Sequence, residues 1–385
     1  MKAKLGLLAI SVLVVLIAGE IAVRVAAPEM WLPGEDEPQG IMHRRSPDPL
    51  LTYELRPGAR ISFPREGGGR GTVTFEVNAF GLRDRADLPR DKPAGTRRIL
   101  VVGDSIVFGL GVELPETLAK RLQAELHTRG VEVECIGVAV SGYDALQAVE
   151  LLRTKGLALQ PDLVVLAYNH TDSTHFSGEL GQFFEALAYS EPMAGDGLRR
   201  AVVPWSQLAR WVFWRLSRLR PPDVAKAKRV EREMDEAWAA YIEAVLARHH
   251  DEPKVSAVLA HARVTAPPLP EPWKTIEESY LDPRSDRRRR AAFLDLQDVG
   301  RERGVPVMVA VIPAFVDHAP YPFEELEAAL LADAERMGLP AVSLSAVLEQ
   351  GAVGELSYDS LHPAAAGHAK LAALLADRVR SRLER

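Results

Sequence analysis

Residues 97–112 read RRILVVGDSIVFGLGV, and this stretch decides the fold. Its apolar run Ile99–Val102 is rich in β-branched residues and predicts a short buried strand. Gly103-Asp104-Ser105 follows directly, and a helix is expected to begin there. A serine between such a strand and helix lies at the carboxyl edge of a sheet, where open α/β sheets bind ligands. Taken alone, however, a serine or aspartate in such a loop is often only a helix cap.

Strand and helix patterns alternate along the rest of the chain. Further strands are expected at 131–138, 163–168, 305–312 and 341–344, and helices at 115–129, 144–155, 324–337 and 364–383. Strands that are apolar at nearly every position are buried on both faces, as in parallel sheets. The pattern predicts a doubly wound α/β domain over residues 98–385, with about five parallel strands.

A long insertion at residues 173–300 interrupts this alternation. In its aromatic-rich part, 205–219, tryptophans alternate with arginines, which suits either a membrane surface or, as we favour, a helix packed on the domain. A long charged helix is expected at 225–249. The basic run Arg287–Arg290 is expected to be a solvated helix face rather than a binding patch.

The N-terminus carries an apolar stretch behind Lys2 and Lys4. One helix over Leu5–Ala27, at about 1.5 Å per residue, is long enough for a hydrocarbon core of about 30 Å. Glu20 and Arg24 interrupt it at a spacing that lets them pair. An uncleaved signal anchor is favoured over a cleaved signal peptide, because no A-x-A site cleanly follows the apolar run.

The predicted organisation is therefore a membrane-anchoring helix at 1–28, a tether and N-terminal extension at 29–97, and the main domain from 98 onward. Either form of the N-terminal segment places the main domain outside the cytoplasmic membrane. The expected location is the cell membrane, with a single pass and an extracytoplasmic domain.

Composition excludes some classes of function. The chain has 385 residues, of which 26% are charged, and its formal net charge of −6 offers no basic field for nucleic acid. Its single cysteine, Cys135, excludes an intramolecular disulfide and is expected to be buried in a strand.

A second polar motif stands near the C-terminus, where residues 359–363 read DSLHP. The three-residue spacing lets one turn hold the Asp359 carboxylate against Nδ1 of His362, which leaves Nε2 available as a general base. Pro363 suits the first turn of the helix that follows. The motif follows the last predicted strand, so it falls at the same sheet edge as Ser105.

Two more loops fall at that edge. Ser141-Gly142-Tyr143 follows the second strand, and residues 169–172, which read NHTD, follow the third. A glycine lets its backbone N–H approach a reacting carbonyl closely, and an Asn side chain is able to donate to the same oxyanion. Four loops thus predict a nucleophile, a base with its orienting acid, and oxyanion donors on one rim.

The four blocks RRILVVGDSIVFGLGV, CIGVAVSGYDALQ, PDLVVLAYNHTD and DSLHPAAAGH resemble those of the SGNH/GDSL hydrolases, over roughly 72–172 and 300–383. The stretch VNAFGLRD, Val77–Asp84, resembles the lead-in of membrane-anchored bacterial members. The resemblance implies a three-layer α/β/α, flavodoxin-like fold and a serine esterase. It makes Ser105 the nucleophile, His362 the base and Asp359 its orienting acid.

The resemblance also places the N–H groups of Ser105 and Gly142 in the oxyanion hole. One departure concerns the third donor. The third block usually ends in Asn-Asp, whereas this chain has Thr171 before Asp172 and an asparagine two residues earlier, at Asn169. Asn169 is preferred as the third donor, with Thr171 as the alternative.

Other polar residues are given lesser roles. His170 and His175 flank the third block and are candidates for substrate contact. No histidine pair has metal-ligand spacing with supporting carboxylates, so no metal or cofactor is expected. Gly109-x-Gly111 lacks the third glycine of a dinucleotide-binding fingerprint.

The expected function is hydrolysis, through an acyl-enzyme, of an ester in a cell-envelope glycan or lipid, O-acetyl esters included. The first alternative is an O-acyltransferase that passes the acyl group to an envelope polysaccharide, and the second is a non-catalytic glycan-binding scaffold. The expected partners are a small-molecule or glycan ester and, through the N-terminal helix, the membrane.

Overall fold

The computed structural model describes residues 2–26, 42–65, 71–172, 206, 208–209, 211–212, 215, 224–250, 256–258, 273–318 and 320–384. The chain divides into two compact units, one of Met1–His43 with Leu180–Glu233 and the other of Arg44–Glu179 with Met234–Arg385. This division does not coincide with the expected boundaries at residues 28 and 97, which stay predictions. The tether at 29–41, His175 and most of 173–223 lie outside the described residues.

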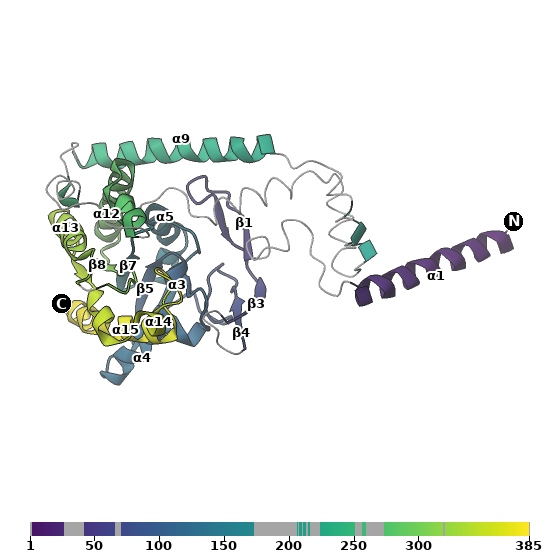
Figure 1. Cartoon of the computed structure of the whole chain (residues 1–385), viewed down its shortest axis with the longest axis horizontal. Coiled ribbons are helices and arrows are strands. Elements are labelled where there is room, and N and C mark those ends of the chain that lie inside the picture. The colour runs from purple at the N-terminus through teal and green to yellow at the C-terminus, as the bar shows by residue number, and fades with distance from the viewer. Residues whose placement is uncertain are drawn as a thin grey trace. The chain divides into compact units, whose positions relative to one another are not determined.

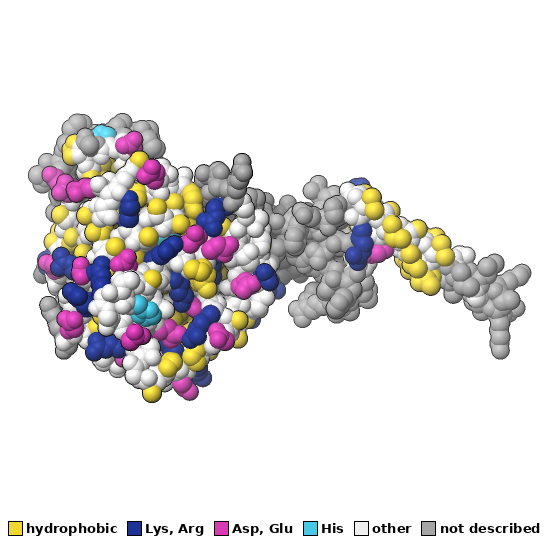
Figure 2. Space-filling model, turned by 90° about the horizontal axis from the view of Figure 1, so that it is seen from below, with side chains coloured by type: hydrophobic (Ala, Val, Ile, Leu, Met, Phe, Trp, Pro, Cys, Tyr) yellow, Lys and Arg dark blue, Asp and Glu magenta, His cyan; other side chains and the backbone are white. Residues whose placement is uncertain are grey.

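In the first unit, α1 (Lys2–Ala26) carries hydrophobic side chains along its described length (Figure 2). The predicted pair within it is present, with Arg24 Nε 2.7 Å from Glu20 Oε1. Glu20 also accepts hydrogen bonds from Ser206 Oγ at 2.8 Å and from the N–H of Leu208 at 3.0 Å. Among the described helices none combines the length and apolarity that crossing a bilayer requires, so the expected transmembrane helix is not found.

The second unit is built on a five-stranded parallel sheet, as predicted (Figure 1). Its strands stand in the order β6-β5-β7-β8-β9. The first of them along the chain, β5, lies between β6 and β7, and β8 and β9 follow on the β7 side. The central strands are buried at almost every position because helices cover both faces. The strands are β5 (Arg97–Gly103), β6 (Val133–Ala139), β7 (Leu163–Tyr168), β8 (Val307–Val311) and β9 (Ala341–Ser343).

Helices lie on both faces of this sheet. On one face α5 (Ala145–Thr154) packs against α12 (Pro283–Arg303), and on the other α4 (Leu118–Thr128) packs against α15 (Ala365–Leu383) (Figure 1). The predicted helices and strands thus form within a few residues of their expected ends. Other helices in the described part of the chain are α3 (Ser105–Phe108), η1 (Leu114–Glu116), η2 (Gly156–Leu159), α9 (Val224–Arg248), α11 (Trp273–Leu281), α13 (Glu324–Arg336), η3 (Ser345–Gln350) and α14 (Val353–Leu356).

The N-terminal extension adds two small sheets to the domain. In them β1 (His43–Arg45) pairs with β2 (Tyr53–Leu55), and β3 (Arg60–Pro64) runs antiparallel to β4 (Thr72–Glu76). The β4 strand lies within the expected N-terminal extension. Its neighbour along the chain is the VNAFGLRD stretch, which contacts the turn that begins at Ser105.

The expectation of a solvated basic face at Arg287–Arg290 is wrong. The last three of these arginines are 7%, 0% and 5% exposed, because α12 packs against α5 and β8 and carboxylates lie opposite the arginines. Arg288 pairs with Asp144, and Arg289 pairs with Asp286 and Asp333. A buried guanidinium is tolerated only with such partners, and a basic run does not reveal them. Cys135 is buried and free, as predicted.

Candidate active site

Ser105, His362 and Asp359 form one continuous hydrogen-bonded chain. Ser105 Oγ lies 3.0 Å from His362 Nε2, although the two residues are 257 positions apart in the sequence. His362 Nδ1 lies 2.8 Å from Asp359 Oδ2. The structure therefore brings together the three residues that the sequence predicts as nucleophile, base and orienting acid.

The turn around Asp359 fixes the direction of the imidazole. Asp359 Oδ1 accepts the backbone N–H groups of Leu361 at 2.7 Å and His362 at 2.6 Å, while Oδ2 contacts the ring. Burial raises the pKa of the Asp359 carboxyl, but the hydrogen bonds from His362 and Leu361 outweigh it and hold the pKa at about 2. The carboxylate is therefore ionised near neutral pH and orients Nδ1–H toward itself and Nε2 toward Ser105.

Ser105 begins α3 at the end of β5, as the sequence predicts. Asp104 caps this helix by accepting the N–H of Ile106 at 2.9 Å. A Cβ at Gly103 would lie 2.7 Å from the Val107 side chain and 3.1 Å from the carbonyl oxygen of Ala167, so only glycine lets β5 end this close to β7. Ser105 itself is 5% exposed.

Arg83, in the VNAFGLRD stretch, holds the far end of the turn that begins at Ser105. Its guanidinium donates to the carbonyls of Phe108 at 2.8 Å, Gly109 at 2.6 Å and Val112 at 2.6 Å. The same group stacks over the Phe75 ring at 4.2 Å. Burial lowers the pKa of Arg83 to about 10, which leaves it charged at neutral pH. The sequence marked this stretch only by resemblance, and nothing in it showed which carbonyls Arg83 would meet.

The predicted oxyanion donors differ in what the structure gives them. Gly142 has a φ of +80°, a left-handed conformation that favours glycine, at the start of the loop before α5. Asn169 is 1% exposed, and its side-chain amide donates to Asp104 Oδ2 at 2.9 Å and to Asp172 Oδ2 at 3.1 Å. An amide group has two protons, so both are already held by carboxylates. Thr171 Oγ1 donates to Asn169 Oδ1 at 2.7 Å.

Asn169 thus bridges two buried carboxyls, one of which, Asp104, immediately precedes Ser105. Burial raises the pKa of Asp104, with the Ile106 N–H acting in the opposite direction. Burial and the nearby Asp104 charge raise the pKa of Asp172 well above its ordinary value. No pattern in the sequence indicates this pair, because Asp104 and Asp172 belong to different loops and meet only when β5 and β7 pair.

His170 lies near Asp359 and His362, and its side chain is buried, at 7% exposed. Burial lowers its pKa to about 4, against the opposing effect of Asp359, so the ring is neutral near pH 7. Its Nδ1 is buried without a hydrogen-bond partner among the described residues. Contact of His170 with substrate stays a prediction.

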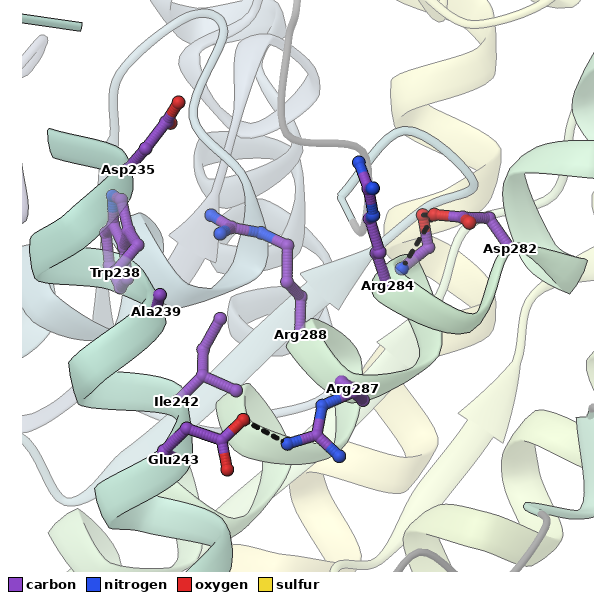
Figure 3. A pocket seen from close by; sticks show the side chains of 10 residues that line it. Asp235, Trp238, Ala239, Ile242, Glu243, Asp282, Arg284, Arg287 and Arg288 are labelled. Atoms are coloured by element: carbon purple, nitrogen blue, oxygen red, sulfur yellow. Dashed lines mark hydrogen bonds and ion pairs between the residues drawn. The ribbon is translucent and has the colours of Figure 1, made fainter. Parts of the chain in front are cut away.

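A pocket of about 360 Å³ lies between α9 and the start of α12 (Figure 3). Trp238 and Ile242 from α9 and Arg284, Arg287 and Arg288 from α12 line it, and no member of the triad does. Within the described part of the chain, no three His, Cys, Asp or Glu side chains are grouped so that they would hold a metal ion.

No family model and no curated protein matches the chain. Solved structures with a similar fold include a catalytic mutant of the acetylxylan esterase Axe2 from Geobacillus stearothermophilus (TM-score 0.38, 10% identity, 74% of this chain and 94% of that chain covered). A lipase/acylhydrolase from Enterococcus faecalis aligns with a TM-score of 0.37 at 15% identity, covering 74% and 96% of the two chains.

A putative lipolytic protein of the G-D-S-L family from Desulfitobacterium hafniense aligns with a TM-score of 0.32 at 10% identity, covering 73% and 98%. With TM-scores below 0.5, these likenesses support no inference about activity. The function is therefore inferred from the residues of this chain.

Proposed function

We propose that the chain is a serine ester hydrolase of the SGNH/GDSL type, with Ser105 as nucleophile, His362 as general base and Asp359 as the acid that orients it. The observation that carries this proposal is the 3.0 Å contact between Ser105 Oγ and His362 Nε2, extended by the 2.8 Å contact between Nδ1 and Asp359. A hydroxyl, an imidazole and a carboxylate in this order are the parts that acyl transfer to serine requires.

The reaction proceeds in two steps. His362 Nε2 takes the Ser105 proton as Oγ attacks the ester carbonyl, and it then gives that proton to the departing alcohol. Water, deprotonated by the same nitrogen, attacks the acyl-enzyme. The imidazolium then returns that proton to Ser105 Oγ as the acid is released. Asp359 stays ionised and stabilises the imidazolium that forms in each step, which its low pKa favours.

The oxyanion of each tetrahedral intermediate is assigned to the N–H groups of Ser105 and Gly142. Ser105 is the first residue of α3, and the first N–H groups of a helix have no partner within it. The positive φ of Gly142 supports a close approach of its peptide to the substrate. Asn169 becomes a third donor only if its side-chain amide breaks a hydrogen bond to Asp104 or to Asp172. The two backbone N–H groups therefore carry most of this role.

The proposal is tested with an active-site fluorophosphonate probe and with short-chain and long-chain model esters. We expect the probe to label Ser105, and the Ser105→Ala variant to lose both labelling and hydrolysis. Ser360→Ala is the matched control, because this serine is exposed in the Asp359–His362 turn. The hydrogen bond from the Phe315 N–H to its backbone carbonyl survives the change. A wild-type chain that neither reacts with the probe nor cleaves any ester contradicts the assignment.

The group that accepts the acyl from the acyl-enzyme distinguishes hydrolysis from transfer. Acetate release that does not depend on a glycan acceptor supports the hydrolase, whereas product that forms only with the acceptor supports an O-acyltransferase. An envelope glycan or lipid ester as substrate, and a location outside the cytoplasmic membrane, stay predictions from the sequence.

A further inference from the structure

Tyr53 of the N-terminal extension contacts the loop that carries Gly142. Its hydroxyl donates to the carbonyl oxygen of Ser141 at 2.8 Å. The hydroxyl of Tyr143 donates back to the carbonyl of Tyr53. The two rings meet edge to face with their centres 5.2 Å apart, and both side chains are buried, at 1% and 2% exposed. The two tyrosines therefore form a reciprocal clamp across 90 positions of sequence.

The clamp extends into the first turn of α5. Gln147 Nε2 donates to the carbonyl of Leu51 at 3.3 Å. Gln147 also completes a capping box with Asp144, because each side chain accepts the backbone N–H of the other residue. Leu51 and Tyr53 thus hold the β6–α5 loop at two points, one on each side of Asp144.

A strained turn directs the extension toward this loop. Thr52 has a φ of +60°, a conformation that is rare for a β-branched residue and persists only where the surroundings enforce it. Its carbonyl accepts the N–H of Ser46 at 2.9 Å, and its hydroxyl donates to Met234 Sδ at 2.7 Å. The turn lets the residues on both sides of Thr52 bond to the same loop.

The loop is held from α12 as well. Arg288 extends between α9 and α12 (Figure 3), pairs with Asp144 and lies over the Trp238 ring at 5.1 Å. Asp144 is fixed by this ion pair and Ser141 by the Tyr53 hydroxyl. Gly142 therefore lies in a segment that is fastened on both sides.

We propose that Tyr53 is a positioning residue that aims and strengthens the Gly142 N–H as an oxyanion donor; this rests on the proposed function. The Ser141 carbonyl that Tyr53 binds and the Gly142 N–H belong to one planar peptide group, in which the two bonds point in opposite directions. Holding the oxygen therefore fixes the direction of the N–H. A hydrogen bond to the oxygen also polarises the peptide and makes its N–H a better donor.

The Tyr53→Phe variant removes the hydroxyl and keeps the ring. We expect kcat for a model ester to fall about tenfold, less than for complete loss of an oxyanion donor, with KM little changed. Inhibition by benzeneboronic acid, whose tetrahedral adduct on serine has an oxygen in the oxyanion hole, is expected to weaken by the same factor. The pH midpoint of kcat/KM is expected to stay in place, because Tyr53 does not contact His362.

Tyr241→Phe is the matched control, since it removes a tyrosine hydroxyl that donates to Asp295 at 2.7 Å, away from the β6–α5 loop. Equal kcat in the two variants overturns the proposal. Amide hydrogen exchange over residues 141–147 gives an independent readout, and faster exchange in Tyr53→Phe than in Tyr241→Phe supports the clamp. If Tyr53→Phe does not fold, Tyr143→Phe removes the reciprocal bond and is expected to show the same two effects.

Failure of the proposed function looks different. In that case the fluorophosphonate probe leaves Ser105 of the wild-type chain unlabelled. The exchange of residues 141–147 then decides the clamp by itself.

Discussion

The Tyr358 hydroxyl donates to the carbonyl of Gly111 at 3.0 Å and so joins the loop that carries His362 to the loop that follows Ser105. A Cβ at Gly111 would lie 2.7 Å from the Tyr358 ring, so this contact requires glycine. Tyr358 immediately precedes Asp359, and Gly111 lies in the turn that follows α3. Gly111 belongs to the Gly109-x-Gly111 pair, which lacks the third glycine of a dinucleotide-binding fingerprint. Its close contact with Tyr358 is the structural reason for a glycine at this position.

Gly111→Ala is expected to push the Tyr358 ring away and to shift the Asp359–His362 turn relative to Ser105. A displacement of about 1 Å between reacting groups is able to lower kcat by up to about 100-fold. The control is Gly130→Ala, which has a similar positive φ of +75° but no atom within 4 Å of the added Cβ. Both variants pay about 1 kcal/mol for the left-handed conformation, and only Gly111→Ala is expected to lose activity on a model ester.

The carboxylate of Asp359 is expected to be essential in its ionised form. Asp359→Asn replaces an acceptor of three N–H groups with an amide that favours the wrong imidazole tautomer, so kcat is expected to fall about 10³–10⁴-fold. Because the pKa of Asp359 is about 2, this group does not titrate between about pH 4 and pH 9. Wild-type kcat/KM is therefore expected to rise through one ionisation, that of the imidazole, and a second carboxylate-like ionisation in the profile would contradict this assignment.

Asn169 is expected to matter for stability as much as for rate. Its amide supplies a hydrogen bond to each of two buried carboxyls, and Asn169→Ala is expected to cost about 2–4 kcal/mol of unfolding free energy. The pKa values of Asp104 and Asp172 are raised, so the folded chain binds more protons than the unfolded one and loses stability as pH rises above their ordinary range. Without the amide the carboxylate forms are less stable still.

The loss of unfolding free energy in Asn169→Ala is thus expected to be larger at about pH 8 than at about pH 5, as measured by thermal unfolding at both pH values. Thr171→Val serves as the comparison, because it removes a hydroxyl that donates to the Asn169 oxygen and keeps the Asn169 amide that donates to both carboxyls. An Asn169→Ala protein that keeps its stability and loses only kcat would instead favour a direct oxyanion role for the amide.

Glu327 on α13 provides a separate pH dependence. Burial raises its pKa to about 7, although the Tyr321 and Ser343 hydroxyls that donate to it act in the opposite direction. The folded chain therefore holds a proton here that the unfolded chain releases near pH 4.5. The resulting stability is complete below that value and is lost as pH rises through about 7.

Glu327→Gln is expected to remove this dependence, which amounts to about 3 kcal/mol at most, so its unfolding temperature falls less than that of the wild type between about pH 5 and pH 8. Glu335→Gln, at an exposed position of the same helix, is the control. Parallel pH profiles for all three proteins would show that Glu327 is ionised in the fold.

The sequence by itself determined the α/β class, the ends of most strands and helices in the domain, and the four loops at one sheet edge. These features are local: apolar runs mark buried strands, and residues that follow such strands share the carboxyl edge of a parallel sheet. The meeting of Ser105 with the Asp359–His362 turn follows from that rule, and the structure places them in contact.

Only the tertiary structure decided what surrounds this edge. It turned the amide of Asn169 toward Asp104 and Asp172, buried the arginines of α12 against carboxylates, and set the Tyr53 hydroxyl on the Ser141 carbonyl. Apart from the contact between Asn169 and Asp172, these contacts join residues that are far apart in the sequence, and no periodic pattern in the sequence indicates which residues will meet. Their partners are chosen by packing, because a buried polar group must find whatever complementary group the assembled fold brings within reach.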